Sequence, residues 1–257
     1  MFSFVARVLV GCCGWAVKGG RKAYFSRFPT IELQETFYRL PRLETARRWR
    51  EEAPEGFVFC MKAWQAVSHP VSSPTWRRAG LKVGKEKQQR YGFLRPVKEN
   101  FEAWDMSTDV AKALGARIVV VQTPPTMPAD DQSVKNAVEF FRYASSSGLS
   151  VGWEPRGKIA ELKHVVSDVC SKTNVIHITD LLRASPAVES PILYTRLHGL
   201  GRKEVNYSYK YTDEDLRRLA EKVSEFIVED AFVLFNNVSM ADDAERFTKL
   251  HRLEWKR

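Results

Sequence analysis

Eight short apolar runs recur along the chain, and each one ends at a polar or charged residue. Near-continuous runs of β-branched and aromatic residues are typical of strands that are buried on both faces, as in a parallel sheet. The runs occupy residues 8–10, 30–31, 58–61, 118–121, 150–153, 175–179, 192–195 and 232–235. If these strands close into a barrel, their polar endings all lie on one rim, which is where barrels of alternating strands and helices have their active sites.

Stretches with helical periodicity separate the apolar runs. Apolar residues recur at helical spacing from Lys98 to Gly115, after Ser133, along Ile159–Val169 and after Thr212. Strands that alternate with helices predict a parallel α/β architecture. The length of 257 residues is typical of one eight-fold barrel. No linker separates two cores, so we expect a single TIM-type (β/α)8 barrel domain over residues 1–257.

Two segments depart from an ideal barrel. The interval from Asp180 to Ser190 has hardly any room for a helix, so we expect a reduced helix between strands six and seven. Residues 63–97, after the third strand, form an insertion that is rich in Trp, Arg, Lys, Gly and Pro. Insertions at the carboxyl ends of strands become lids or substrate grips, and we expect this one over the rim. An open doubly wound sheet is the alternative, but eight strand endings favour closure.

Positive charge is concentrated in the insertion. The net charge is +9, and between Arg77 and Lys98 eight Lys and Arg residues face only Glu86 as an opposing charge. Such a cluster attracts phosphate backbones through counterion release. A merely solvated basic surface is the alternative, and charge alone leaves the two open.

The remaining composition indicates a cytoplasmic protein. Four cysteines show no metal-ligand spacing and are most simply core thiols in a reducing compartment. No apolar stretch approaches the length needed to span a bilayer, so we expect no membrane association.

A set of short motifs extends through nearly the whole chain. These motifs are Gly11, Gly14-Trp15, Glu32, Thr36–Pro41, Trp49, Gly56–Phe59, Lys62, His69, Gln122–Pro125, Trp153–Arg156, Asp180, Arg196–Gly199 and Phe235–Asn237. Each motif is weak alone, but together they resemble the YecE-like family, known as domain of unknown function 72. The resemblance implies a TIM-barrel fold and no settled activity. Proposals for such proteins include nucleic-acid binding or nuclease-like action, by similarity of fold to barrel-type abasic-site endonucleases.

Four of the strand endings supply candidate catalytic groups. Glu32, Glu154 and Asp180 are carboxylates that can act as a general base or as a cation ligand. His198 can transfer a proton near neutral pH or bind a metal through one ring nitrogen. His198, His69 and the three carboxylates suffice for one ion at most, so a single divalent metal is possible and no cofactor is certain.

Other polar residues near the rim are candidate ligand-binding groups. Guanidinium groups suit phosphate or carboxylate, a lysine adds a point charge, and amides orient a ligand. We expect ligand contacts from Lys62, His69, Gln122, Arg156, Arg196, Asn236, Asn237 and Tyr38. The alternative is that Glu154 with Arg156, or Asp180 with Lys62, form ion pairs that hold the rim together.

Three tyrosines alternate after the seventh strand, at Tyr207, Tyr209 and Tyr211. An extended segment would show all three rings on one side, where they suit stacking on bases or sugars. Alternating tyrosines also commonly pack a loop against a barrel, and this second interpretation is slightly favoured.

These observations predict an intracellular enzyme that acts on a phosphate-bearing ligand. The leading candidate for the ligand is nucleic acid, and the expected activity is that of a nuclease- or repair-like hydrolase. No Walker A motif, GxGxxG turn or GxSxG elbow is present. Two alternatives stay open: a non-catalytic module that binds nucleic acid or protein, and an enzyme acting on a sugar phosphate or a similar anion. Reaction type, substrate, metal dependence and oligomeric state are not decided by the sequence.

Overall fold

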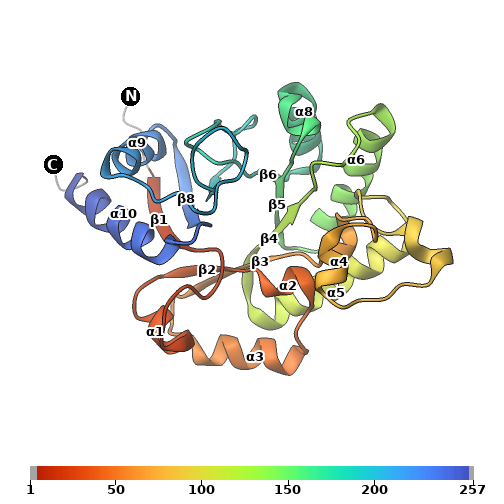
Figure 1. Cartoon of the computed structure of the whole chain (residues 1–257), viewed down its shortest axis with the longest axis horizontal. Coiled ribbons are helices and arrows are strands. Elements are labelled where there is room, and N and C mark those ends of the chain that lie inside the picture. Colours follow the sequence, from red (N-terminus) through yellow and green to blue (C-terminus); the bar gives the residue numbers. More distant parts are fainter. Residues whose placement is uncertain (1–4, 255–257) are drawn as a thin grey trace. The chain divides into compact units, whose positions relative to one another are not determined.

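Eight parallel β-strands alternate with helices along the chain in this computed structural model, which describes residues 5–254 (Figure 1). The strands are β1 (Val5–Cys12), β2 (Thr30–Leu33), β3 (Val58–Lys62), β4 (Ala116–Gln122), β5 (Ser150–Glu154), β6 (Ile176–His177), β7 (Ile192–Leu197) and β8 (Val228–Phe235). Their order in the sheet is β6-β5-β4-β3-β2-β1-β8-β7. This topology is that of a (β/α)8 barrel, so the expected fold class is confirmed.

The helices have the following bounds. They are α1 (Gly20–Phe25), α2 (Glu35–Tyr38), α3 (Leu43–Glu52), α4 (Pro74–Arg78), α5 (Lys98–Leu114), α6 (Asp131–Ser145), α7 (Lys158–Glu161), α8 (Lys163–Thr173), α9 (Asp213–Ser224) and α10 (Met240–Glu254). Two short 3-10 helices are η1 (Gln65–Val67) and η2 (Lys85–Arg90). No helix within residues 5–254 is both long enough and apolar enough to cross a membrane.

The chain forms two compact units, and each unit is assembled from separate stretches of sequence. Unit 1 consists of Met1–Glu32, Ala53–Val58 and Ile178–Arg257, and unit 2 consists of Leu33–Glu52 and Phe59–His177. Unit 1 includes strands from early and from late in the sequence. No single position in the sequence therefore divides unit 1 from unit 2.

Unit 1 is organised around the first and the last strands. β1 pairs in parallel with β8 along its whole length, and β8 pairs with β7. β1 also meets β2 at Gly11, where an added Cβ would lie 2.2 Å from the carbonyl oxygen of Thr30. Only glycine fits such a close approach of two backbones. α10 packs against β1, β8 and α9.

The first turn of α9 shows why this helix begins where the sequence predicts. The Thr212 hydroxyl accepts from the backbone N–H of Asp215 at 3.1 Å, and the Asp215 carboxylate accepts from the backbone N–H of Thr212 at 3.0 Å. This reciprocal capping box satisfies two backbone donors that the helix cannot satisfy itself. Three members of the predicted stripe, Leu216, Leu219 and Val223, are buried in the helix, whereas the fourth, Phe226, lies beyond its end and is half-buried.

Unit 2 contains the parallel strands β3, β4, β5 and β6. Its helix α5 ends as predicted at Gly115, whose φ of 64° is the left-handed conformation that favours glycine. α6 begins at Asp131, earlier than the position of Ser133 suggests. The reason is that the Asp130 carboxylate accepts from the backbone N–H of Ser133 at 2.8 Å and so caps the helix.

Two expectations about elements are wrong in detail. The stripe along 159–169 does not form one helix, because Leu162 has φ −85° and ψ 69° and separates α7 from α8. The sixth strand ends at His177 rather than at Thr179, which forms only an isolated bridge with Thr195. The interval up to Ser190 is short, as expected, but the described chain has no helix between β6 and β7, so the predicted reduced helix is absent there.

The insertion, residues 63–97, folds back on itself and is tied to α5. The Asn100 side chain accepts from the backbone N–H of Gly92 at 3.1 Å and donates to the carbonyl oxygens of Gly92 and Arg95 at 3.2 and 2.9 Å. The Trp76 indole N–H donates to the backbone oxygen of His69 at 3.0 Å. The base of the insertion is therefore well packed, whereas η2 buries no residue.

All four cysteines are buried thiols, as expected for core residues. Burial raises the pKa of the Cys12 thiol to about 12, and it raises that of Cys170 to about 12. Both groups are therefore protonated near neutral pH and are poor nucleophiles.

Candidate functional site

The four strands of unit 2 each end in a polar side chain. Lys62, Gln122, Glu154 and His177 are the last residues of β3, β4, β5 and β6. Because these strands are parallel and neighbours in the sheet, their carboxyl ends lie at one edge. The structure thus brings together three residues that the sequence predicts for the site and adds His177.

Lys62 is held at this edge by contacts from two directions. Its Nζ donates to Gln122 Oε1 at 2.7 Å and lies 4.0 Å from the centre of the Phe37 ring. The hydroxyl of Thr36 donates to the Lys62 carbonyl oxygen at 2.7 Å, which fixes α2 beside the end of β3. The ammonium group is therefore fixed between an amide and an aromatic face, a favourable setting for a cation.

Glu154 and Arg156 form a buried ion pair. Arg156 Nη2 donates to Glu154 Oε1 at 2.7 Å, and the two residues are 5% and 4% exposed, respectively. This is the rim ion pair that the sequence offers as the alternative to a ligand-binding role. A charge-assisted bond of this length orients the carboxylate strongly. Roles for both residues toward a ligand remain predictions.

Two histidines of unit 2 are uncharged at neutral pH. Burial, together with the positive charge of Lys62, lowers the pKa of His69 to about 3. Burial lowers the pKa of His177 to about 4, although the negative charge of Glu154 acts in the opposite direction. His69 Nδ1 lies 2.8 Å from the hydroxyl oxygen of Ser68. The formal charge at these strand ends therefore comes from Lys62, Arg156 and Glu154.

Tyr38, another predicted ligand-binding residue, is connected to the insertion. Its hydroxyl oxygen accepts from Arg78 Nη1 at 3.3 Å, and the Arg78 guanidinium carbon lies 5.0 Å from the centre of its ring. These contacts join α2 to α4 within unit 2. They place one arginine of the basic cluster next to the end of α2.

In unit 1, Glu32 and Arg196 are partners of each other. Arg196 Nη2 lies 3.0 Å from Glu32 Oε1, and the Tyr194 hydroxyl donates to Glu32 Oε2 at 2.8 Å. All three residues are 0% exposed. Both carboxylate oxygens thus accept a bond from β7, as in an internal ion pair that joins β2 to β7. The catalytic role of Glu32 and the ligand-binding role of Arg196 stay predictions.

Asp180, His198 and Asn236 lie together in unit 1, as the sequence predicts. Asp180 Oδ2 accepts from the backbone N–H of His198 at 3.1 Å, and Asp180 Oδ1 accepts from the backbone N–H of Leu182 at 3.2 Å. Asn236 Nδ2 lies 3.1 Å from His198 Nδ1. As this amide is oriented, Nδ1 accepts and the ring proton is on Nε2. His198 can then offer a proton from Nε2.

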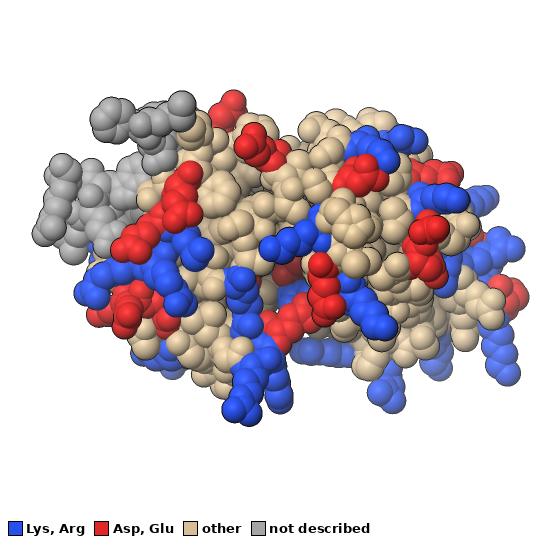
Figure 2. Space-filling view, turned by 90° about the horizontal axis from the view of Figure 1, so that it is seen from above, with Lys and Arg blue, Asp and Glu red and all other residues tan. Residues whose placement is uncertain are grey.

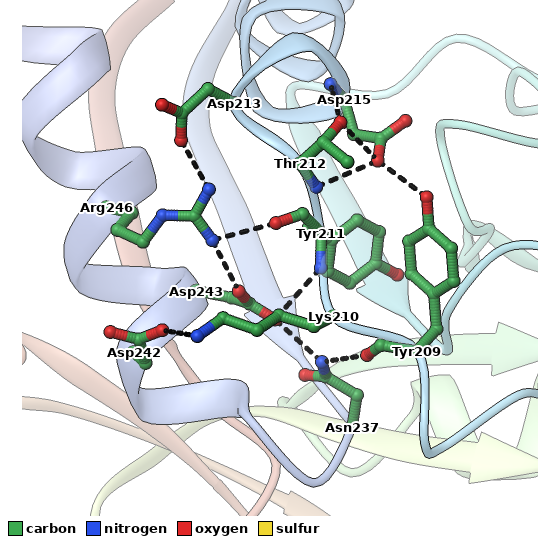
Figure 3. Close-up of polar contacts among 10 residues, drawn as sticks. All are labelled: Tyr209, Lys210, Tyr211, Thr212, Asp213, Asp215, Asn237, Asp242, Asp243 and Arg246. Atoms are coloured by element: carbon green, nitrogen blue, oxygen red, sulfur yellow. Dashed lines mark hydrogen bonds and ion pairs between the residues drawn. The ribbon is translucent and has the colours of Figure 1, made fainter.

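Asn237 has a different environment from Asn236. Its Nδ2 donates to the carbonyl oxygen of Tyr209 and to Asp243 Oδ2, both at 2.7 Å. Figure 3 shows this amide within a polar network that connects the segment from Tyr209 to Thr212 with the start of α10. Asn237 therefore anchors the loop after β7, and the expected ligand contact from its side chain stays a prediction.

The three alternating tyrosines differ in exposure, contrary to the less favoured interpretation in which all three rings lie on one side. Tyr207 is 52% exposed, whereas Tyr211 is 1% exposed. The Tyr211 hydroxyl oxygen accepts from the backbone N–H of Gly199 at 2.7 Å, and the Tyr211 ring packs against Tyr209 with centres 5.3 Å apart. Tyr209 and Tyr211 thus pack the loop, which is the interpretation that the sequence slightly favours. Tyr207 lies beside His198, with ring centres 6.4 Å apart.

No group of three or more His, Cys, Asp or Glu side chains is arranged to hold a metal ion in the part of the chain that the structure describes. The predicted ligands make other contacts instead. Glu32 and Glu154 bond to arginines, and Asp180 bonds to backbone N–H groups. A single divalent ion remains a prediction, and no step below depends on one.

Sequence reasoning missed two residues of these clusters. Tyr194 precedes Arg196 by two positions in β7, and alternate residues of a strand share a face. This two-residue spacing could have indicated that the side chains of Tyr194 and Arg196 lie on the same face of β7. His177 lies in the middle of the apolar run 175–179, where the sequence gives no sign of a strand end. The register that pairs it with Trp153, the neighbour of Glu154, cannot be read from one sequence.

Comparison with known proteins supports the family assignment. The family model described as "Protein of unknown function DUF72" matches residues 9–256. UPF0759 protein YunF from Bacillus subtilis (strain 168) is 23% identical over 273 residues, which cover 93% of this chain and 91% of that protein. A crystal structure of a DUF72 family protein from Enterococcus faecalis V583 has a TM-score of 0.70 at 17% identity, covering 96% of this chain and 98% of that one.

Beyond this family, the fold is similar to that of a D-tagatose 3-epimerase-like protein. Its TM-score is 0.53 at 14% identity, and the match covers 96% of this chain and 99% of that one. Identity this low shows a shared fold and nothing about chemistry. The family match, in contrast, extends over almost every strand and helix described above. The chain belongs to the DUF72 family, as its resemblance to YecE-like proteins predicts.

Proposed function

We propose that the protein is an enzyme that binds a small anionic molecule at the strand ends of unit 2. The observation that carries this proposal is the pair of buried cations, Lys62 and Arg156, which are 7% and 5% exposed. Burying charged groups is costly, and an anionic ligand group that bonds to both would offset part of that cost. The carboxyl ends of barrel strands are also where enzymes of this fold have their active sites.

Burial of the two cations favours a small ligand over a polymer. A phosphate or carboxylate group of a small molecule can reach a buried cation more readily than a nucleic-acid backbone that lies across the surface. The D-tagatose 3-epimerase-like protein, which shares the fold, is named after an enzyme that acts on a sugar. A sugar that carries an anionic phosphate group is therefore the first class of ligand to test. This support is an analogy of fold only.

Each charged residue then has a distinct task. Lys62 supplies a point charge and Arg156 supplies forked donors, so together they hold and orient the anionic group. Glu154 is oriented by Arg156 and is the candidate proton acceptor. His177 stays uncharged at neutral pH, since burial lowers its pKa to about 4. It therefore adds hydrogen-bonding capacity without adding charge.

The test combines binding and turnover with two variants of the cluster. Calorimetry measures the affinity for a panel of sugar phosphates, and mass spectrometry of the mixtures detects any product. We expect Lys62→Gln to weaken binding at least about tenfold, because a charge-assisted contact is lost. Glu154→Gln should abolish turnover and leave binding largely intact.

The matched control is Lys172→Gln. Lys172 is an exposed lysine of the same unit that pairs with Asp168 at 2.7 Å, and its replacement should change neither affinity nor turnover. Full turnover by Glu154→Gln would refute the assignment of the proton acceptor. Equal binding by wild type and Lys62→Gln would refute the anion site.

Nucleic acid remains a second candidate because of the insertion. Lys82 and Lys85 are exposed and form no ion pair with any residue that the structure describes, whereas Arg90 pairs with Glu99 at 3.0 Å. Unpaired surface cations are available to a phosphate backbone. The face drawn in Figure 2, however, has acidic side chains interspersed among its basic ones.

Binding of labelled DNA and RNA across a salt series tests this candidate. If the insertion holds phosphates, the combined change of Lys82, Lys85 and Lys87 to Gln should weaken binding and flatten the salt dependence by about 0.9 per lost contact. The same three-lysine change at the exposed residues Lys135, Lys158 and Lys163 is the control. Equal effects of the two triple variants would speak against the insertion as a specific contact surface.

A further inference from the structure

A cavity of about 230 Å³ lies between α5 and the end of α6 in unit 2. Next to it, aromatic side chains fill the space between the helices, with the Phe101 ring 4.3 Å from Tyr143 and 6.3 Å from Phe140, measured between centres. Beyond Tyr143 the partners become small, because α6 ends and Ser146 and Ser147 follow. Serine side chains are too short to fill the gap, so a cavity remains.

Two buried polar groups line this cavity without a partner. Trp104 is 0% exposed and Thr108 is 5% exposed. Within the described chain, neither the Trp104 indole N–H nor the Thr108 hydroxyl has a hydrogen-bond partner. Buried polar groups in native proteins are almost always satisfied, and leaving one unsatisfied is unfavourable. Both polar atoms lie just beneath the cavity wall, so a molecule in the cavity can supply the missing partners once these side chains turn toward it.

The outer part of the cavity is polar and has more negative than positive charge. The Tyr143 hydroxyl donates to Asp105, at 2.9 Å from both carboxylate oxygens, and so orients that carboxylate. Asp109 and Lys112 also line the cavity, and the structure records no ion pair for either among residues 5–254. Two carboxylates and one ammonium disfavour an anion, which distinguishes this cavity from the cluster around Lys62.

We infer that the cavity binds a small uncharged polyhydroxy molecule of about the size of a monosaccharide. A hydroxyl group donates one hydrogen bond and accepts up to two. A ring with several hydroxyls can therefore accept from the Trp104 N–H, bond to Thr108 in either direction and donate to the carboxylates of Asp105 and Asp109. The exposed ring of Tyr143 offers an apolar face to the C–H groups of such a ligand.

The indole N–H of Trp104 is a direct probe of this inference. In the ¹⁵N-labelled protein its cross-peak, assigned by its loss in Trp104→Phe, should shift in a saturable way as D-glucose or D-ribose is added. We expect dissociation constants of about millimolar strength. The indole N–H groups of Trp76 and Trp153 are internal controls, because they already donate to His69 O and Thr123 Oγ1.

Two variants connect the shift to the cavity. Thr108→Val keeps the shape of the side chain and removes its hydroxyl, and Asp109→Asn removes a carboxylate. Each should weaken sugar binding about tenfold, as expected for the loss of one good hydrogen bond. Thr108→Val should not lower the melting temperature, because the lost hydroxyl has no partner in the protein.

The control for stability is Thr173→Val in α8. Thr173 is similarly buried, but its hydroxyl donates to the Val169 carbonyl oxygen at 2.7 Å, so this variant should melt lower. No saturable shift with either sugar would overturn the inference, and so would equal affinities for wild type and Thr108→Val. A shift caused by 1,4-diaminobutane and by neither sugar would overturn it in favour of a cationic ligand. None of these readouts depends on turnover at Glu154.

Discussion

The hydroxyl of Tyr194 makes one buried hydrogen bond whose energetic contribution can be measured cleanly. It donates to Glu32 Oε2 at 2.8 Å, and both residues are 0% exposed. Tyr194→Phe removes this oxygen alone, so the ring keeps its stacking on Phe232, with centres 5.4 Å apart. A hydrogen bond to a charged group contributes about 1.5–3 kcal/mol, and we expect the variant to lose about 2 kcal/mol.

Urea unfolding followed by circular dichroism measures this loss. The midpoint should fall with no change in slope, because the surface exposed on unfolding is the same in both proteins. In thermal unfolding, a chain of this size loses about 2–4 °C per kcal/mol, so the melting temperature should fall by about 4–8 °C.

The matched control is Tyr143→Phe. The Tyr143 hydroxyl also bonds to a carboxylate, that of Asp105 at 2.9 Å, but this contact is exposed to solvent. Water replaces the lost bond there, and we expect a change below about 0.5 kcal/mol. If the two variants lose the same stability, burial does not strengthen the Tyr194–Glu32 bond, and the description of Glu32 as part of an internal ion pair fails.

Three further predictions concern pH, a helix cap and a close backbone contact. The pKa of His69 is lowered to about 3 in the folded protein, so below about pH 6.5 the unfolded chain binds a proton that the folded chain does not. The free energy of unfolding should therefore fall as pH decreases from about 6.5 toward 4, by at most about 1.4 kcal/mol per pH unit. Urea midpoints at several pH values should show a weaker dependence for His69→Gln and an unchanged one for a variant of the exposed His164. Thr212→Ala removes the capping box of α9 and should cost about 1 kcal/mol in urea unfolding, whereas no loss would contradict the cap. Gly11→Ala brings a Cβ to 2.2 Å from the Thr30 carbonyl oxygen, so we expect a large fall in soluble yield and melting temperature, and a normal melting curve would disprove the close approach.

The strands were predictable because burial on both faces requires continuous apolar runs. All eight runs correspond to strands, and their polar endings lie at or next to the strand ends, with Asp180 as the exception because β6 already ends at His177. Helix boundaries were less predictable, since they depend on local contacts such as the cap by Asp130 or the non-helical backbone of Leu162. The spacing of apolar residues shows neither the cap nor the break in the helix.

The candidate site was predictable in its location and not in its pairings. Glu32 and Arg196 both occur at strand ends, where ligand-facing side chains are expected. Their mutual bond, and the position of Tyr194 against the same carboxylate, depend on which strands face one another across 162 positions of sequence. Similarly, Asn236 and Asn237 are adjacent in sequence but contact different partners, His198 and Asp243. The two asparagines have different partners because their side chains point in different directions, which the residue type alone does not reveal.

The pairing of β1 with β8 has a consequence for synthesis on the ribosome. β1 emerges long before its partner along its whole length, residues 228–235, is made. Unit 2, which ends at His177, is complete long before that. Until β8 emerges, the backbone N–H and C=O groups on one side of β1 therefore lack their native partners, and apolar strand edges of this kind aggregate readily. The β1 edge therefore stays open to wrong pairing until β8 has left the ribosome.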